Sequence, residues 1–122
     1  MTKTLLEKMF LKSEYAAAVL NLPKELDTEF YSERKIYTIL EGKYNFILAF
    51  YSKKQELQKD ALKLKKALLP NALLWVAYPK NKALETDLNR DILHELLKEY
   101  GLDSVSLVSL NATWSAMRFK VL

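Results

Sequence analysis

The first residues that could do chemistry are Tyr78, Pro79 and Lys80, which directly follow the apolar run 73–77. Open α/β sheets bind ligands at the carboxyl ends of their strands, so these residues predict a site for a small ligand or a phosphometabolite. The competing interpretation is a proline that ends the strand, followed by a solvated lysine. Turn chemistry alone accounts for the residues in that case, and we favour it.

A second polar stretch, 86–91, begins a helical pattern. The amino end of a helix attracts anions, and Arg90 adds a positive charge there. The alternative is that Thr86 or Asp87 caps the helix, while Arg90 pairs locally with Asp87 or Asp91. Because the two acids oppose anion binding, this structural interpretation is favoured.

The third group is Trp114, Ser115 and Arg118, close to the end of the sequence. Trp114 is expected to pack, whereas Arg118 is expected to reach an acid across the sheet. An ion pair from Arg118 to Asp87 or Asp91 would join the candidate residues into one polar network. That pair is a hypothesis, which the distance between the groups tests.

Recognised catalytic and metal-binding patterns are absent from the sequence. There is no cysteine, which removes disulfides, thiolate zinc sites and cysteine nucleophiles. Neither Gly-x-Ser-x-Gly nor a Walker-type loop occurs. His94 is the single histidine, and with Asp91 and Glu95 nearby it could bind a metal weakly, but a solvated side chain is favoured. We therefore assign no catalytic residue, no cofactor and no metal ligand.

Composition and charge describe an ordinary globular domain. Half of the 122 residues are apolar and 28% are charged, which favours a single domain, 1–122, with its own core. The net charge of +4 is small and only 3 of the 19 basic residues are arginines, so nucleic-acid binding is not favoured. No apolar run is long enough to span a membrane and the first residues lack a signal-peptide core, so we expect a cytoplasmic protein without membrane contact.

Hydrophobic periodicity predicts the elements that position these side chains. Strands are predicted near 15–20, 35–40, 44–51, 72–78, 104–110 and 114–121, and helices near 3–12, 53–69 and 87–100. Strand, helix and strand in succession around 53–69 form a βαβ unit, so its two strands should be parallel. We expect an α/β, three-layer, Rossmann-like sheet that is mostly parallel and ends in a C-terminal antiparallel hairpin.

Several boundaries carry their own expectations. Pro70-Asn71 should stop helix 53–69, and Gly101 should end helix 87–100. Residues 24–33 suit one helical turn. Strands 35–40 and 44–51 are separated by so few residues that a hairpin is the natural local interpretation, and their pairing is left open.

Three stretches, in this order, resemble a family of small uncharacterised bacterial proteins, a domain of unknown function. The stretches are Leu74-Trp75-Val76-Ala77-Tyr78-Pro79-Lys80, Thr86-Asp87-Leu88-Asn89-Arg90-Asp91 and Trp114-Ser115-Ala116-Met117-Arg118-Phe119. The element order also resembles the second half of the Rossmann-like methyltransferase fold. The resemblance implies a degenerate methyltransferase-like fold, and no function comes with it.

The turn after the first strand bears on whether a cofactor binds. Methyltransferases hold the cofactor over a glycine-rich turn at this place, where backbone must approach the ligand closely. Here the turn is Asn21-Leu22-Pro23-Lys24-Glu25, and the two glycines, Gly42 and Gly101, lie elsewhere. We therefore expect no binding of S-adenosylmethionine or a dinucleotide in the usual mode.

The patterns as a whole favour a non-catalytic α/β domain that acts through an unknown protein partner or through self-association. The alternative is a small-ligand or phosphometabolite site at the carboxyl ends of the strands, which could be enzymatic. The candidate residues for either a ligand site or a polar network are Tyr78, Lys80, Thr86, Asp87, Arg90, Asp91, Trp114 and Arg118.

Overall fold

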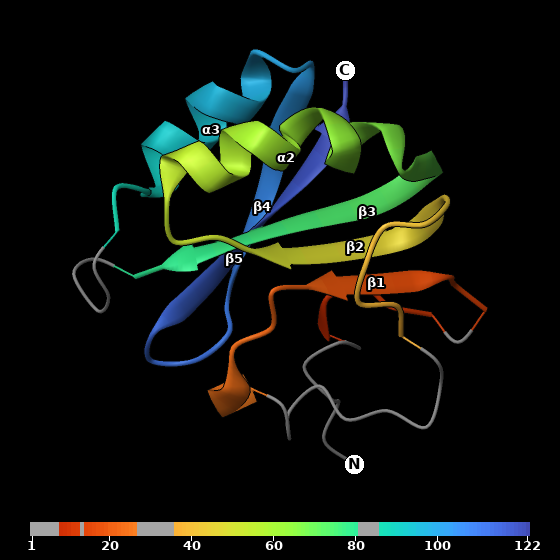
Figure 1. The fold of residues 1–122 in the computed structure, drawn as a ribbon, viewed down its shortest axis with the longest axis horizontal. Coiled ribbons are helices and arrows are strands. Elements are labelled where there is room, and N and C mark those ends of the chain that lie inside the picture. The colour runs from red at the N-terminus through yellow and green to blue at the C-terminus, as the bar shows by residue number, and fades with distance from the viewer. Residues whose placement is uncertain (1–7, 13, 27–35, 81–85) are drawn as a thin grey trace.

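The structure is a computed structural model that describes residues 8–12, 14–26, 36–80 and 86–122 (Figure 1). Within this part of the chain, five strands form one sheet in the order β1-β2-β3-β5-β4. The elements are β1 (Ala17–Leu20), the 3₁₀ helix η1 (Lys24–Leu26), β2 (Tyr44–Phe50), α2 (Lys54–Lys66), β3 (Leu68–Pro79), α3 (Arg90–Lys98), β4 (Leu102–Ser109) and β5 (Trp114–Val121).

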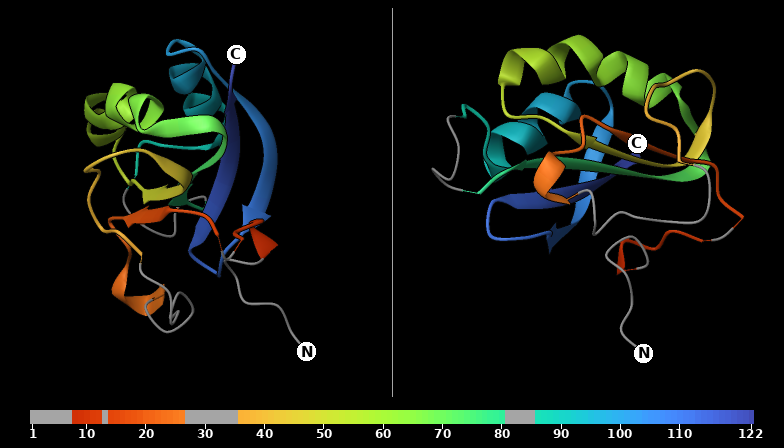
Figure 2. Two further views of the ribbon diagram at one scale, coloured as in Figure 1. Left: turned by 90° about the vertical axis from the view of Figure 1, so that its right-hand side faces the viewer. Right: turned by 60° about the horizontal axis from the view of Figure 1, so that its bottom comes forward.

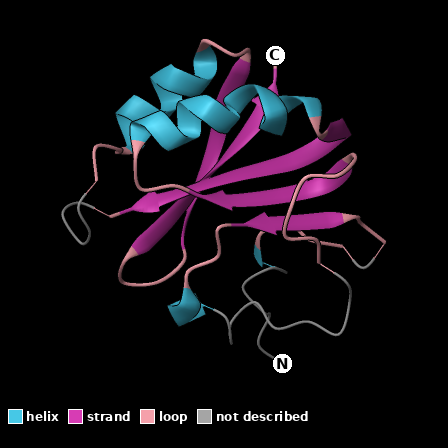
Figure 3. Ribbon diagram, viewed as in Figure 1, coloured by secondary structure: helices cyan, strands magenta, loops and turns pink. Residues whose placement is uncertain are grey.

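The sheet is parallel on one side and antiparallel on the other. Strands β1, β2 and β3 run parallel, and β5 is antiparallel to both β3 and β4. Helix α2 connects β2 to β3 as the crossover of a βαβ unit (Figure 3). The predicted Rossmann-like α/β class and its C-terminal antiparallel hairpin are confirmed. The sheet was predicted to be mostly parallel, whereas two of its four strand pairings are parallel and two are antiparallel. The parallel strands therefore share one carboxyl edge, formed by Leu20, Phe50 and Pro79.

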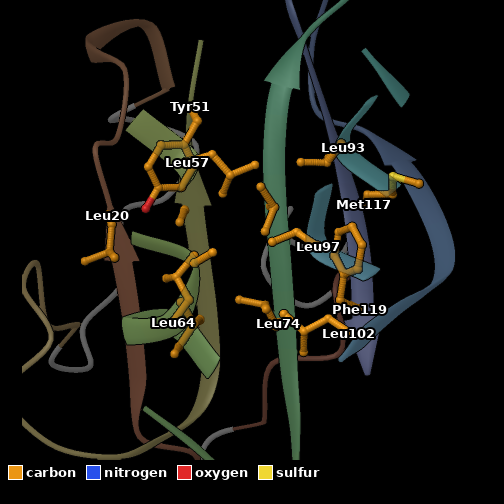
Figure 4. Packing of buried hydrophobic residues seen from close by; sticks show 14 of the residues in the cluster. Leu20, Tyr51, Leu57, Leu64, Leu74, Leu93, Leu97, Leu102, Met117 and Phe119 are labelled. Atoms are coloured by element: carbon orange, nitrogen blue, oxygen red, sulfur yellow. The ribbon is translucent and has the colours of Figure 1, made fainter. Parts of the chain in front are cut away.

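Both long helices cover the same face of the sheet (Figure 2). Met9 is buried in the core cluster of the other face. Leu57 and Leu64 of α2, with Leu93 and Leu97 of α3, are fully buried against that face. Figure 4 shows these side chains meeting Leu74 and the side chains of β5 in one continuous layer. With Ala61 between Leu57 and Leu64, apolar residues recur every three or four positions, and this spacing predicted both helices from the sequence.

The opposite face has a second core cluster, and Trp75 is its largest fully buried side chain. Trp75 is fully buried and donates its indole N–H to the carbonyl of Met9 at 3.1 Å. Leu26 of η1 is buried in the same cluster. This face is therefore closed, within the described chain, by short segments before and after β1.

The prediction of a strand over 35–40 is wrong. Residue 35 lies outside the described residues, and 36–40 make a single parallel bridge, between Tyr37 and Ala18. Tyr37 exchanges hydrogen bonds with Ala17 and Val19 of β1, so the segment meets the outer edge of β1 and does not pair with β2. Ile39 is 58% exposed, which explains why an apolar, β-branched stretch does not continue as a strand here.

Pro70 and Asn71 do not stop a helix, because both lie inside β3. Helix α2 ends earlier, at Lys66, with Ala67 as its C-cap. Asn71 has φ 62°, and the β2–β3 register jumps between the pairs Tyr44–Leu68 and Phe46–Leu73. The proline is tolerated because it occupies a bulge, where no ladder hydrogen bond needs its missing N–H.

The remaining boundary predictions have mixed outcomes. Helix α3 ends at Lys98, two residues before the predicted end at 100, and Gly101 takes φ 79° in the turn that follows. The helical turn expected within 24–33 appears as η1, whose following residues lie outside the described part. Most of predicted helix 3–12 also lies outside it; of the rest, Lys8 is helical and Phe10 takes φ 70°, a conformation that ends a helix.

No helix in the described ranges has both the length and the apolar character needed to cross a membrane.

Candidate functional site

A pocket of about 470 Å³ lies where the carboxyl end of β3 meets the start of α3. It is lined by Tyr78, Lys80, Asn89, Arg90, Asp91, Leu107 and Ser115. Four of these, Tyr78, Lys80, Arg90 and Asp91, are among the residues predicted from the sequence. The structure therefore brings half of the eight candidates together at the expected edge of the sheet.

Tyr78 is one of two buried side chains that line the pocket, and Ser115 is the other. The Tyr78 side chain lies on the helix-bearing face of the sheet and is hydrogen-bonded to Ser115, its register partner on β5. Burial raises the pKa of the Tyr78 phenol above its ordinary value, although Arg90 and Ser115 act in the opposite direction. The phenol therefore stays protonated near neutral pH and can donate a hydrogen bond to a ligand.

Lys80 is held by the β4–β5 hairpin and is not a freely solvated lysine. Its backbone N–H donates to the carbonyl of Thr113 at 2.7 Å. Its ammonium donates to the hydroxyl of Ser109, on β4. These two contacts fix the direction of the side chain, so its charge stays beside the pocket.

Arg90 and Asp91 form the exposed side of the pocket. The Arg90 Nε lies 3.8 Å from the Asp91 carboxylate, and the side chains are 66% and 87% exposed. This confirms the predicted local pair with Asp91, but an ion pair this exposed contributes little stability. A ligand can therefore replace either side chain as the partner of the other with little loss of stability.

The N-cap of α3 is Asn89, so the prediction that Thr86 or Asp87 caps this helix is wrong. The Asn89 side-chain oxygen accepts a hydrogen bond from the Ile92 N–H at 2.8 Å. Asparagine is as good a cap as aspartate, so local rules could not choose among the three residues. Asn89 is thus a pocket residue that the sequence analysis missed.

Thr86 and Asp87 instead bind the start of α2. The Thr86 hydroxyl donates to the carbonyl of Ser52 at 2.6 Å and accepts from the Leu88 N–H at 3.0 Å. The Asp87 carboxylate accepts from the Lys54 N–H at 2.6 Å. Both residues therefore join the segment after β2 to the segment before α3 and do not line the pocket.

The hypothesised ion pair between Arg118 and Asp87 or Asp91 is wrong. Along β5, Met117 and Phe119 face the helices, so Arg118 between them faces the other side of the sheet. There its Nε donates to the Ser106 hydroxyl at 3.2 Å, and its guanidinium lies 5.5 Å from the centre of the Phe10 ring.

Trp114 lies on this far face as well, and it packs as expected. Its ring meets Phe50 edge-on with ring centres 5.3 Å apart, and its indole N–H donates to the Glu25 carboxylate at 3.1 Å. Since Trp114 and Arg118 are four residues apart on one strand, both belong to the second core face and not to the pocket.

His94 is half-buried and paired. Its Nδ1 lies 2.7 Å from the hydroxyl of Ser104 on β4. The described residues contain no group of three or more His, Asp or Glu side chains placed to hold a metal ion. The contact with β4 gives His94 a packing role that its helical position alone did not indicate.

The turn after β1 is a second feature at the same edge of the sheet. Asn21 has φ 58°, in the left-handed region. Its side-chain amide donates to the carbonyl of Phe50, the last residue of β2, at 3.1 Å. The end of β1 is therefore tied to the end of β2.

Comparisons with known proteins report on the fold. No family model matches the sequence, and no curated protein does. Among solved structures, a LepI variant in complex with SAH and a substrate analogue matches with a TM-score of 0.62 and 11% identity, covering 97% of this chain and 39% of LepI. The glycopeptide N-methyltransferase MtfA matches with a TM-score of 0.63 and 6% identity, covering 96% of this chain and 88% of MtfA. An S-adenosylmethionine-dependent methyltransferase from Clostridium acetobutylicum matches with a TM-score of 0.58 and 8% identity, covering 87% of this chain and 75% of that enzyme.

These matches correct the expectation of a non-catalytic domain. The similar structures are named as methyltransferases or hold SAM or SAH, and this chain shares their fold, so the prediction that leaned against an enzyme is wrong. Identities of 6 to 12% show the fold alone, and the chain spans 39% of the length of LepI. The resemblance to a small bacterial family stays a prediction, since no family model matches.

Several of the similar structures hold SAM or SAH, and the Asn21 turn bears on whether this chain could fit such a ligand. The missing glycine was expected to exclude the usual turn, but asparagine also tolerates the left-handed conformation, and Asn21 adopts it. The Leu22 side chain packs against the second core cluster. Pro23 has no N–H, so the turn offers a ligand one donor fewer than glycine would. The turn therefore reaches the left-handed backbone conformation at Asn21 without a glycine.

Proposed function

We propose that the protein binds a small molecule at the carboxyl edge of β1, β2 and β3 and methylates it, with S-adenosylmethionine as the methyl donor. The observation that carries the proposal is the left-handed Asn21 turn, whose side chain is hydrogen-bonded to the end of β2. It occurs in a chain that matches methyltransferase structures over nearly its whole length. The substrate and the activity of the whole protein are part of this proposal.

The donor would lie against the Asn21 turn and the end of β2. The acceptor would occupy the pocket at the end of β3, the strand that neighbours β2 in the sheet. Adjacent strands lie about 4.8 Å apart, so the ends of β1 and β3 are separated by about 10 Å. That separation suits two ligands that meet at the end of the middle strand.

The pocket residues support a polar acceptor. When bound, S-adenosylmethionine supplies an electrophilic methyl group on a sulfonium sulfur. Tyr78 donates a hydrogen bond from its protonated phenol, and Lys80 and Arg90 hold an anionic or polar part of the acceptor. The Asp91 carboxylate is the base that lines the pocket, and it takes up the proton that an acceptor oxygen or nitrogen loses as it gains the methyl group.

Isothermal titration of the full chain with S-adenosylmethionine and S-adenosylhomocysteine tests the proposal. ATP is the matched control, because it shares the adenosine part and lacks the amino-acid part. Saturable binding of both S-adenosyl compounds, with ATP inert, is the expected result. If neither compound binds at millimolar concentration, the proposal is overturned.

A further inference from the structure

A second pocket lies at the opposite edge of the sheet, where the parallel strands begin. It has a volume of about 500 Å³ and combines three lysines with an apolar wall. The lysines are Lys43, just before β2, Lys65 in the last turn of α2, and Lys120 near the end of β5. The wall includes Leu68, Leu69 and Val121. None of these residues belongs to the carboxyl-edge pocket, so the two surfaces are separate.

The charges in this pocket are not neutralised by the described part of the protein. No described carboxylate lies within ion-pair distance of Lys43, Lys65 or Lys120. Asp103 stands opposite Lys120 in the β4–β5 register, but these two residues do not form an ion pair. Like charges that gather around one concave surface create a positive potential, which an anion relieves.

Lys65 is the most constrained of the three lysines. It is half-buried, and its ammonium occupies the space that a side chain at position 101 would need. Gly101 has φ 79°, so glycine is required there for the backbone as well. The missing side chain at Gly101 thus leaves room for the ammonium of Lys65, which is one of the cations that line the pocket.

The bulge in β3 adds backbone groups to the same surface. Leu69, Pro70, Asn71 and Ala72 have no partners in the register of β2 or of β5. These four residues line the pocket, so the bulge borders it outside the regular strand pairing. An oxyanion can accept hydrogen bonds from backbone N–H groups as well as from lysine.

We propose that this pocket binds the oxyanion group of a small amphipathic molecule, a phosphate or a carboxylate attached to an apolar part. Lys43, Lys65 and Lys120 hold the oxyanion, and Leu68, Leu69 and Val121 pack against the apolar part. This site is independent of the methyl-transfer proposal, because it lies at the other end of the strands and uses different residues.

Titration of the full, isotope-labelled chain by NMR tests the site. The probes are phenyl phosphate, benzoate, inorganic phosphate and benzyl alcohol, which separate the two anion types from the apolar part. We expect phenyl phosphate or benzoate to give saturable shifts at the amides of Leu69, Ala72 and Val121. Benzyl alcohol should give none, and inorganic phosphate should bind more weakly than phenyl phosphate.

Charge-removing variants connect the binding to the lysines. Lys65→Gln and Lys120→Gln should each weaken phenyl phosphate binding about tenfold, the size expected for one hydrogen bond to a charged group. Lys59→Gln is the matched control, since Lys59 is exposed on α2 and does not line the pocket. Circular dichroism confirms that each variant is folded. The proposal is overturned if no probe saturates, or if Lys59→Gln weakens binding as much as the pocket variants.

Discussion

The Asp87 carboxylate caps a helix to which it does not belong: it accepts a hydrogen bond from the backbone N–H of Lys54, the first residue of α2, at 2.6 Å. The residue at the N-cap position, Lys53, provides no side-chain cap. A negative charge at this end of α2 also suits the helix dipole. Asp87 therefore couples the two helices that cover one face of the sheet.

Replacing Asp87 tests this coupling. Asp87→Ala should lower the free energy of unfolding by about 1 kcal/mol, the usual cost of a lost helix cap. Urea denaturation measures the change. Asp91→Ala is the matched control, because Asp91 is 87% exposed and pairs only weakly, so its loss should be close to neutral. Equal effects of the two substitutions would contradict the capping role of Asp87.

Trp75 fixes the segment around Met9 to the sheet, and its indole N–H can be tested alone. Trp75→Phe removes the hydrogen bond to the Met9 carbonyl and leaves a cavity in a fully buried position. We expect a loss of about 2 to 3 kcal/mol in the free energy of unfolding. Amide exchange at residues 9–11 should also become faster, since these residues lose their anchor. Unchanged exchange would show that other contacts hold the segment.

The folded protein should lose stability at alkaline pH because of Tyr51. Burial raises the pKa of its phenol above the ordinary value of 10, and the hydrogen bond to Asp60, 2.7 Å long, acts in the same direction. Above about pH 10 the unfolded chain ionises this tyrosine while the folded chain does not. The free energy of unfolding should therefore fall with rising pH, by up to about 1.4 kcal/mol per pH unit for this residue.

The Tyr51→Phe variant isolates that contribution. At neutral pH it should be less stable than the original protein, because Asp60 loses its partner. Between about pH 10 and 12 the gap should narrow, since phenylalanine cannot ionise. Urea denaturation at a series of pH values measures both the gap at neutral pH and its narrowing at alkaline pH. A gap that stays constant across this range would contradict the assignment to Tyr51.

Local sequence patterns predicted the elements whose stability is local or strongly periodic. Helices α2 and α3 and strands β1 to β5 all follow from apolar spacing, within a few residues at most boundaries. The strand expected at 35–40 failed because pairing depends on a partner, and only Tyr37 finds one, on the outer edge of β1. Pro70 was misread because a bulge, which is a property of two paired strands, removes the penalty for a proline.

The site residues, too, were predicted where local sequence fixes them and missed where a distant partner does. Tyr78 lies near the carboxyl end of β3 and Lys80 directly follows it, and both were predicted at the sheet edge, where the structure has them. Asp87 has a partner 33 residues away, which no local rule could identify. The position of Arg118 was predictable in part: alternation along β5 places it on the same face as Trp114, and Trp114 was expected to pack.

Asn21 offers the sharpest test of the donor site, because two substitutions separate backbone conformation from side-chain chemistry. Asn21→Gly keeps access to φ 58° and loses only the hydrogen bond to Phe50, so the turn should persist and S-adenosylhomocysteine should bind within a few fold of the original affinity. Asn21→Val places a β-branched residue in the left-handed region, which costs about 1 to 2 kcal/mol or more. The turn should then open, and binding should weaken by at least about tenfold. Calorimetric titration of both variants, with thermal unfolding to confirm folding, measures these effects. If Asn21→Val binds as tightly as the original protein, the donor site does not depend on the turn after β1.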